Sequence, residues 1–92
     1  SRPGYQSYLL RYVMIMTAIG LSGDGSEEHP YVVITIPDEY VFMSFIELPK
    51  FKTRGGVGEK LDMFVFDGDE GEYKVWFDIS RARMHLQKES NK

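Results

Sequence analysis

The chain has 92 residues, enough for one compact core and too few for two, so we expect a single domain over 1–92. Hydrophobic residues make up 42% of it and include six Phe, six Tyr and one Trp, which argues against disorder. The net charge of −3 gives no general attraction to phosphate, and the lack of cysteine excludes a disulfide framework and any Cys-containing zinc site. We therefore expect a cytoplasmic protein for which nucleic acid is an unfavourable partner.

The first predicted element is a helix over residues 5–20. Apolar residues recur there at spacings of three and four, as on one stripe of a helix: Tyr5, Tyr8, Leu9, Tyr12, Val13, Met16 and Ile19. Further apolar residues widen this stripe beyond what one small sheet can cover, so we expect the helix to join two copies of the chain in a homodimer. The predicted dimer interface consists of Tyr5, Leu9, Tyr12, Val13 and Met16. The apolar segment Tyr12–Ile19 is far shorter than the roughly 20 residues that span a bilayer, so no membrane association is expected.

Sheet strands are predicted within residues 31–79. The β-branched run Tyr31–Ile36 predicts a strand buried on both faces, and Pro37 is expected to end it because proline cannot donate to a sheet ladder. A second aromatic and β-branched strand is predicted for Tyr40–Leu48. The basic, glycine-rich segment Lys50–Lys60 is then predicted to be a connecting loop.

A hairpin is predicted near the end of the chain. Its strands are Leu61–Asp67 and Tyr73–Ile79, joined by an acidic, glycine-containing turn. A short helix over 80–89, capped by Ser80, is expected to follow. The elements together predict the α+β class, with an N-terminal helix packed on a mostly antiparallel sheet and a short C-terminal helix.

No arrangement of residues predicts a catalytic centre, a cofactor site or a metal site. The two histidines, His29 in a loop and His85 in the last helix, have no partners in a recognisable acid–base or triad pattern. The acidic turn 67–72 is similar to the start of a calcium loop, but Glu72 occupies the position where that loop needs glycine. A solvated turn is the favoured interpretation, and cation binding there stays open.

The segment 50–60 carries two further patterns of this kind. Its glycines precede Lys60 as in a phosphate-binding loop, but the element that follows is a predicted strand rather than a helix. Glu47 and Lys50 are similar to part of a nuclease metal site, but they form an isolated pair in a chain too small for that fold.

Four short motifs are distributed along most of the chain: Tyr8-Leu9-Leu10-Arg11-Tyr12, His29-Pro30-Tyr31-Val32-Val33, Asp38-Glu39-Tyr40 and Ile79-Ser80-Arg81-Ala82. Through these motifs and the hairpin, the chain resembles the stringent starvation protein B family of protease adaptors. The resemblance implies a Sm-like, partly open barrel of four to five strands, dimeric through the first helix, that captures degradation-tagged proteins for the AAA+ protease ClpXP. The chain departs from the family at Pro37, in the loop 49–58 and after Glu89, which leaves tag specificity and delivery to the protease open.

The resemblance also implies a site, in which an unstructured peptide lies between the loop 50–57 and the third strand. The expected peptide-binding residues are Lys50, Phe51, Lys52, Arg54, Val57, Phe64 and Phe66. The cations are expected to favour acidic peptide positions, while an aromatic pocket supplies most of the affinity. The leading interpretation is thus a non-enzymatic peptide- or protein-binding module. The alternatives are a small nuclease or nucleic-acid-associated domain that uses the basic loop, and a structural subunit that assembles through its helix.

Overall fold

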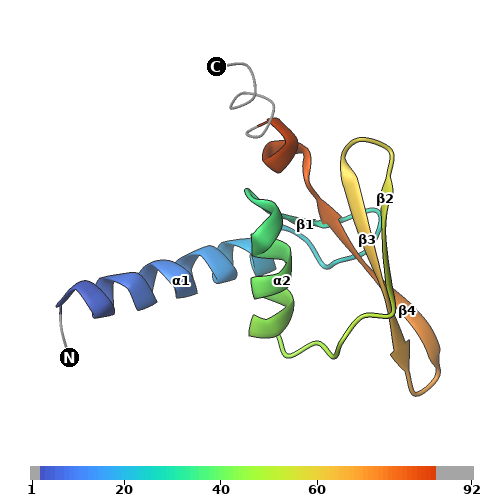
Figure 1. Ribbon diagram of the computed structural model, residues 1–92, viewed down its shortest axis with the longest axis horizontal. Coiled ribbons are helices and arrows are strands. Elements are labelled where there is room, and N and C mark those ends of the chain that lie inside the picture. The colour runs from blue at the N-terminus through green and yellow to red at the C-terminus, as the bar shows by residue number, and fades with distance from the viewer. Residues whose placement is uncertain (1–2, 85–92) are drawn as a thin grey trace.

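The computed structural model describes the backbone of residues 3–84 and the side chains of residues 7–84. Over this part the chain is α+β, with an N-terminal helix and one four-stranded mixed sheet (Figure 1), so the predicted class is confirmed. The elements in chain order are α1 (Pro3–Ser22), β1 (Tyr31–Val32), α2 (Ile36–Phe45), β2 (Thr53–Val57), β3 (Leu61–Gly68) and β4 (Gly71–Asp78). Residues 80–84 add a short helical segment, and the rest of the helix predicted for 80–89 lies outside the described residues.

The sheet has the strand order β1-β4-β3-β2. β2, β3 and β4 form an antiparallel meander, whereas β1 pairs in parallel with the end of β4. The predicted hairpin is confirmed, and its turn closes at the pair Gly68 and Gly71, where Gly71 has a φ of 121°. β1 and β2 are unjoined edges, so the sheet is open and the Sm-like barrel is not confirmed.

Residues 36–45 form a helix where we expected strands. The extended residue Thr35, with φ −130° and ψ 155°, precedes α2, and Pro37 lies in the first turn, where a helix needs no N–H donor. Pro37 therefore helps to start a helix instead of ending a strand. The strand predicted for Tyr40–Leu48 is wrong, and the one predicted for Tyr31–Ile36 is reduced to the two residues of β1.

The core lies between α2 and one face of the sheet. Phe42 of α2 and the strand residues Phe64, Phe66 and Phe77 have at most 1% of their surface exposed. Phe77 makes edge-to-face contacts with Phe64 and Phe42, with ring centroids 5.6 and 6.3 Å apart, a geometry that aromatic pairs prefer. These rings hold α2 on the sheet.

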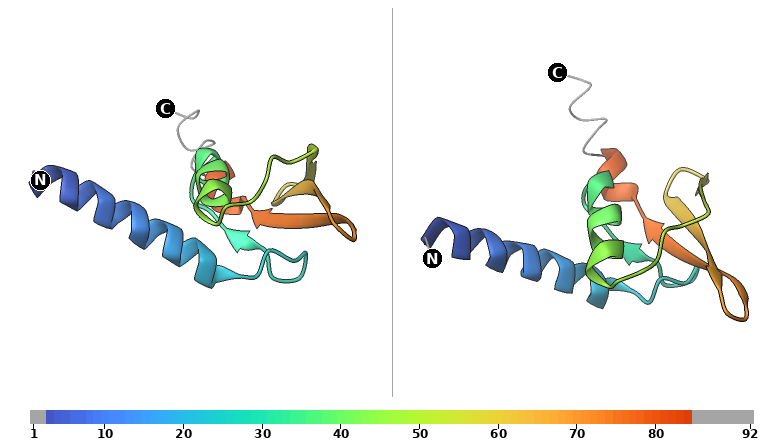
Figure 2. Two further views of the ribbon diagram at one scale, coloured as in Figure 1. Left: turned by 90° about the horizontal axis from the view of Figure 1, so that it is seen from below. Right: turned by 60° about the horizontal axis from the view of Figure 1, so that its bottom comes forward.

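α1 is longer than predicted and projects from this core. It runs two residues past Gly20, the last residue of the predicted helix, and its N-terminal half extends away from the sheet and α2 (Figure 2). Met16 and Ile19 of α1 are buried in the core, and Tyr12 packs against it. Within the described residues, neither helix is long and apolar enough to cross a bilayer.

Two smaller differences concern the loop and the last helix. The predicted loop Lys50–Lys60 contains β2, an edge strand despite two glycines, which are usually unfavourable in strands. Ser80 does not act as a side-chain cap: its hydroxyl donates to Asp78 Oδ1 at 2.6 Å, and the same oxygen accepts from the Ser80 N–H at 2.9 Å. Asp78 therefore supplies the carboxylate at the start of this turn.

Candidate functional site

The peptide-binding residues expected from sequence are divided between core and surface. Phe64 and Phe66 are fully buried, so neither side chain can contact a peptide in this conformation. Phe51 is half-buried, with its ring centroid 4.9 Å from that of Phe64, and Val57 is exposed on β2. β2 pairs directly with β3 and so fills the space in which the peptide was expected to lie.

Two of the three expected cations already have acidic partners. Lys52 Nζ lies 2.6 Å from Glu72 and 3.3 Å from Asp67, and these hydrogen-bonded carboxylates raise the pKa of Lys52. Arg54 is paired with buried carboxylates, whereas the exposed Lys50 has no ion pair with any residue of the described part of the chain. An acidic peptide would therefore compete with existing contacts at Lys52 and Arg54.

Arg54 joins two elements through a cluster of charges inside the fold. Its Nε and Nη2 donate to Oδ2 of Asp62 on β3 at 2.9 and 2.6 Å, which raises the pKa of Arg54. Nη2 also lies 3.5 Å from Oε1 of Glu39 on α2. The guanidinium carbon stands 5.7 Å from the ring centres of Tyr40 and Phe64, within the range of cation–π attraction. The cluster fastens α2 to β2 and β3.

Glu39 is the most unusual member of this cluster. Its side chain is fully buried, and neither carboxyl oxygen has a hydrogen-bond partner among the described residues. Burial, reinforced by the nearby Asp62 carboxylate and partly opposed by Arg54, raises the pKa of Glu39 to about 8. Glu39 is thus mainly uncharged at neutral pH, but a group without solvent contact cannot meet a substrate in this conformation.

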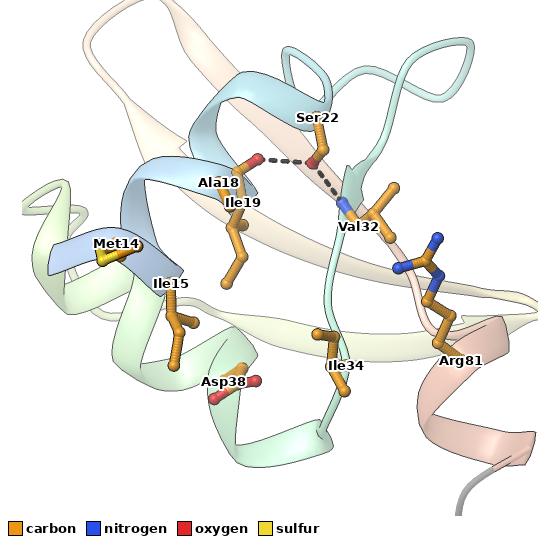
Figure 3. A pocket seen from close by; sticks show the side chains of 9 residues that line it. All are labelled: Met14, Ile15, Ala18, Ile19, Ser22, Val32, Ile34, Asp38 and Arg81. Carbon is orange, nitrogen blue, oxygen red and sulfur yellow. Dashed lines mark hydrogen bonds between the residues drawn. The ribbon is translucent and has the colours of Figure 1, made fainter. Parts of the chain in front are cut away.

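An apolar hollow lies between α1, β1 and α2, and we call it the Ile34 pocket. It has a volume of about 460 Å³, and Figure 3 shows the side chains that line it. They are Met14, Ile15, Ala18, Ile19, Ser22, Val32, Ile34, Asp38 and Arg81. Ile34 stands between Asp38 and Arg81 with 56% of its surface exposed, so this pocket presents apolar surface to solvent with one charge on either side.

Ser22 fixes the wall of the Ile34 pocket. Its hydroxyl donates to the Ile19 carbonyl at 2.6 Å and accepts from the Val32 N–H at 2.8 Å (Figure 3). The outer edge of β1 is therefore already bonded to α1. A ligand in this pocket would be held by side-chain contacts rather than by adding a strand at β1.

A second hollow, which we call the Arg11 pocket, continues from the first along α1. It measures about 320 Å³ and shares Ile15 and Asp38 with the Ile34 pocket. Its other lining residues are Tyr8, Arg11, Tyr12, Met16 and Val41. Arg11 and Asp38 thus line one hollow, and neither forms an ion pair with any residue whose side chain the structure describes.

Comparison with known protein families assigns this chain to one family. The chain matches the family described as "Domain of unknown function (DUF4919)" over residues 2–88. The chain belongs to this family. Neither the curated proteins nor the solved structures contain a significant match to it.

The residues expected at a dimer interface of this DUF4919 domain lie on different sides of α1. Met16 is 2% exposed and belongs to the core of its own chain, while Tyr12 is half-buried with its ring 5.7 Å from that of Phe45. Leu9 and Val13 are exposed, and the side chain of Tyr5 lies outside the described residues. Dimerisation through α1 stays a prediction, and a surface for it would have to be built from the residues that face away from the core.

The chain has two histidines that could take part in acid–base chemistry. His29 is exposed in the loop after α1, and His85 lies outside the described residues. Across the part of the chain that the structure describes, no group of three or more His, Asp or Glu side chains is arranged to hold a metal ion.

Sequence reasoning missed the pocket residues and the charge cluster of this DUF4919 domain. Asp62 could have been found, because strand alternation places it on the same face as Phe64 and Phe66. Thr35-Ile36-Pro37-Asp38-Glu39 is also a helix-start pattern, with proline in the first turn followed by acids. Recognising it would have placed Asp38 and Glu39 on a helix instead of between strands.

Proposed function

We propose that this chain is a non-enzymatic protein-binding module that takes an apolar segment of a partner protein into the Ile34 pocket. The observation that carries the proposal is the pocket itself, an apolar hollow of about 460 Å³ whose walls come from α1, the segment after β1, and α2. Exposed apolar surface of this kind, gathered in one concavity, is typical of sites that receive side chains of another protein.

The charges around the pocket suggest the chemistry of the partner. Arg81 lines one side and has no ion pair within the described residues. An acidic side chain or a terminal carboxylate next to the apolar residues would complement it. Burying one Leu-sized side chain contributes roughly 1.5–3 kcal/mol, more than the 0–1 kcal/mol of an exposed ion pair, so apolar anchors would supply most of the affinity.

A protease adaptor is the more specific form of this proposal. The resemblance to the stringent starvation protein B family supports it, with a degradation-tagged protein as the bound partner, an AAA+ unfoldase as the second partner and the cytoplasm as its location. The nucleic-acid alternative has less support, because Lys52 and Arg54 of the basic segment are already paired with carboxylates.

Fluorescence anisotropy with labelled 12-residue peptides tests the proposal. The panel would contain a degradation-tag peptide and designed peptides with two leucines and a C-terminal carboxylate, each also made with a C-terminal amide. We expect micromolar binding of a leucine-containing carboxylate peptide, a loss of at least tenfold with Ile34→Glu and a smaller loss with Arg81→Ala or the amide.

Val57→Glu is the matched control, because Val57 is an exposed apolar residue on β2 and lines neither pocket. It should leave the affinity within about twofold. If no peptide of the panel binds the folded chain at 500 micromolar, or if Val57→Glu weakens binding as much as Ile34→Glu does, the Ile34 pocket is not the site. If only the designed peptides bind, the adaptor form fails and the general proposal stands.

A further inference from the structure

The N-terminal half of α1 presents an apolar surface that the Ile34 pocket does not account for. Its exposed side chains include Tyr8, Leu9 and Leu10, with 69, 41 and 61% of their surface exposed. These residues lie on different sides of the helix, since successive residues of an α-helix are about 100° apart. Arg11 is the one charged residue in the α1 sequence. A helix with apolar residues exposed on several sides normally has protein around it rather than water.

The Arg11 pocket lies directly beside this surface and is self-complementary. It combines the apolar walls Tyr8, Ile15 and Val41 with one cation, Arg11, and one anion, Asp38. Both charges are without an ion-pair partner in the described chain. A second copy of the same surface can therefore cover the projecting helix, fill the hollow beside it and pair with both charges.

We infer that the Arg11 pocket is occupied by α1 of a second copy of this chain, in a symmetric dimer whose two-fold axis passes near Arg11 and Asp38. In such an isologous contact each copy contributes the same residues, so two arginines and two aspartates gather at the axis. Each cation then has a partner anion across the interface, and the apolar surface of both helices leaves water.

The inference does not depend on the Ile34 pocket binding a partner protein. It also differs from the interface expected from sequence, because Met16 stays in the core of its own chain while Tyr8, Arg11, Ile15 and Asp38 form the contact. The dimer contact shares Ile15 and Asp38 with the Ile34 pocket, whose other lining residues lie outside the contact.

Charge reversal tests the inference, with sedimentation equilibrium at 5–200 micromolar as the measurement. The whole chain is expected to be a dimer. Arg11→Asp would place four negative charges at the axis and Asp38→Arg four positive charges, so each variant alone should be a monomer over this range. An equimolar mixture of the two variants has two charges of each sign at the axis and should form a heterodimer, as should the double variant with itself.

Lys50→Glu is the matched control, since it also reverses an exposed cation but lies outside both pockets. It should stay dimeric. Circular dichroism of every variant checks folding, and Arg11→Glu and Asp38→Lys provide a second charge-reversed pair. Tyr8→Cys, in a chain that otherwise has no cysteine, gives an independent readout: oxidation should link two copies, and adding Arg11→Asp should abolish the link.

Three results would overturn the inference. One is that the wild-type chain is a monomer at 200 micromolar, whether or not this monomer binds lipid vesicles. Another is a single variant that stays dimeric while folded. The third is a mixture of folded, monomeric variants that fails to associate.

Discussion

Arg54 donates two hydrogen bonds to a single carboxylate oxygen of Asp62, from Nε at 2.9 Å and from Nη2 at 2.6 Å. Asp62 is almost completely buried, so this contact supplies the positive charge that permits a carboxylate inside the core. The same guanidinium lies 3.5 Å from Glu39, so one partly exposed side chain serves acids on two elements. Arg54 therefore adds a polar link between α2 and the meander to the aromatic contacts of the core.

Replacing Arg54 with alanine is expected to destabilise the fold strongly. The substitution leaves Asp62 buried without its cation, and breaking a buried pair costs about 3–5 kcal/mol, with the lower end expected because Arg54 is partly exposed. Urea unfolding followed by the fluorescence of Trp76 measures the change. Lys52→Ala removes an exposed ion pair and should cost no more than about 1 kcal/mol; equal losses for both variants would contradict the assignment.

Glu39 should make stability depend on pH in the direction opposite to that of a paired carboxylate. Its pKa is raised from 4.5 to about 8, so the folded chain retains a proton that the unfolded chain releases across this interval. Its contribution to the free energy of unfolding therefore falls as the pH rises from 4.5 to 8, by up to about 1.4 kcal/mol per pH unit, and is constant above that.

The comparison of Glu39→Gln with the wild type isolates this contribution. Glutamine stays uncharged, so the variant should lose less stability than the wild type between pH 5 and pH 8 when both are unfolded with urea. Glu70→Gln, on the exposed hairpin turn, should keep the wild-type pH profile. Parallel profiles for Glu39→Gln and the wild type would show that Glu39 is charged throughout.

Gly20→Ala is expected to stabilise the chain. Glycine inside a helix costs about 0.5–1 kcal/mol relative to alanine, and a methyl group at this position would meet the Phe42 ring at 3.7 Å, an ordinary contact distance. Gly25→Ala is the contrasting change: Gly25 has a φ of 84°, and its methyl group would lie 2.7 Å from the Tyr31 ring. Thermal unfolding should show a higher midpoint for the first variant and a lower one for the second.

Glu47→Gly should also raise stability. Glu47 has a φ of 60° just after α2, where the Leu48 N–H donates to the Met43 carbonyl at 2.9 Å in the usual helix-ending pattern. Glycine adopts this left-handed conformation without the steric cost of about 1 kcal/mol that other residues pay. A lower midpoint of urea unfolding for Glu47→Gly than for the wild type would contradict this account.

The sequence predicted those parts of the fold whose signal is local. The helix at the N-terminus and the hairpin from Leu61 to Ile79 were found because periodicity and turn residues are read within short windows. α2 was missed because its residues Tyr40, Val41 and Phe42 have high strand propensity, and contacts of Phe42 and Met43 with the core outweigh it.

The candidate site was less accessible to sequence reasoning. The Ile34 pocket joins residues from α1, β1, α2 and the last turn, and no local pattern relates Ile34 to Arg81. The basic segment was conspicuous in an acidic chain, but the acids that pair with Lys52 lie more than ten residues away, on the hairpin. Two of its four cations, Lys52 and Arg54, are therefore paired with carboxylates in the folded chain.

The pairing of β1 with β4 has a consequence for the order of folding. β2, β3 and β4 pair with their neighbours in sequence, but Tyr31 must find Phe77 across 46 residues, which costs more chain entropy. The meander is therefore expected to form early, and α1 and β1 to dock late. Since the Ile34 pocket exists only after that docking, a ligand bound there would slow the first step of unfolding and protect the amides around Val33 from hydrogen exchange.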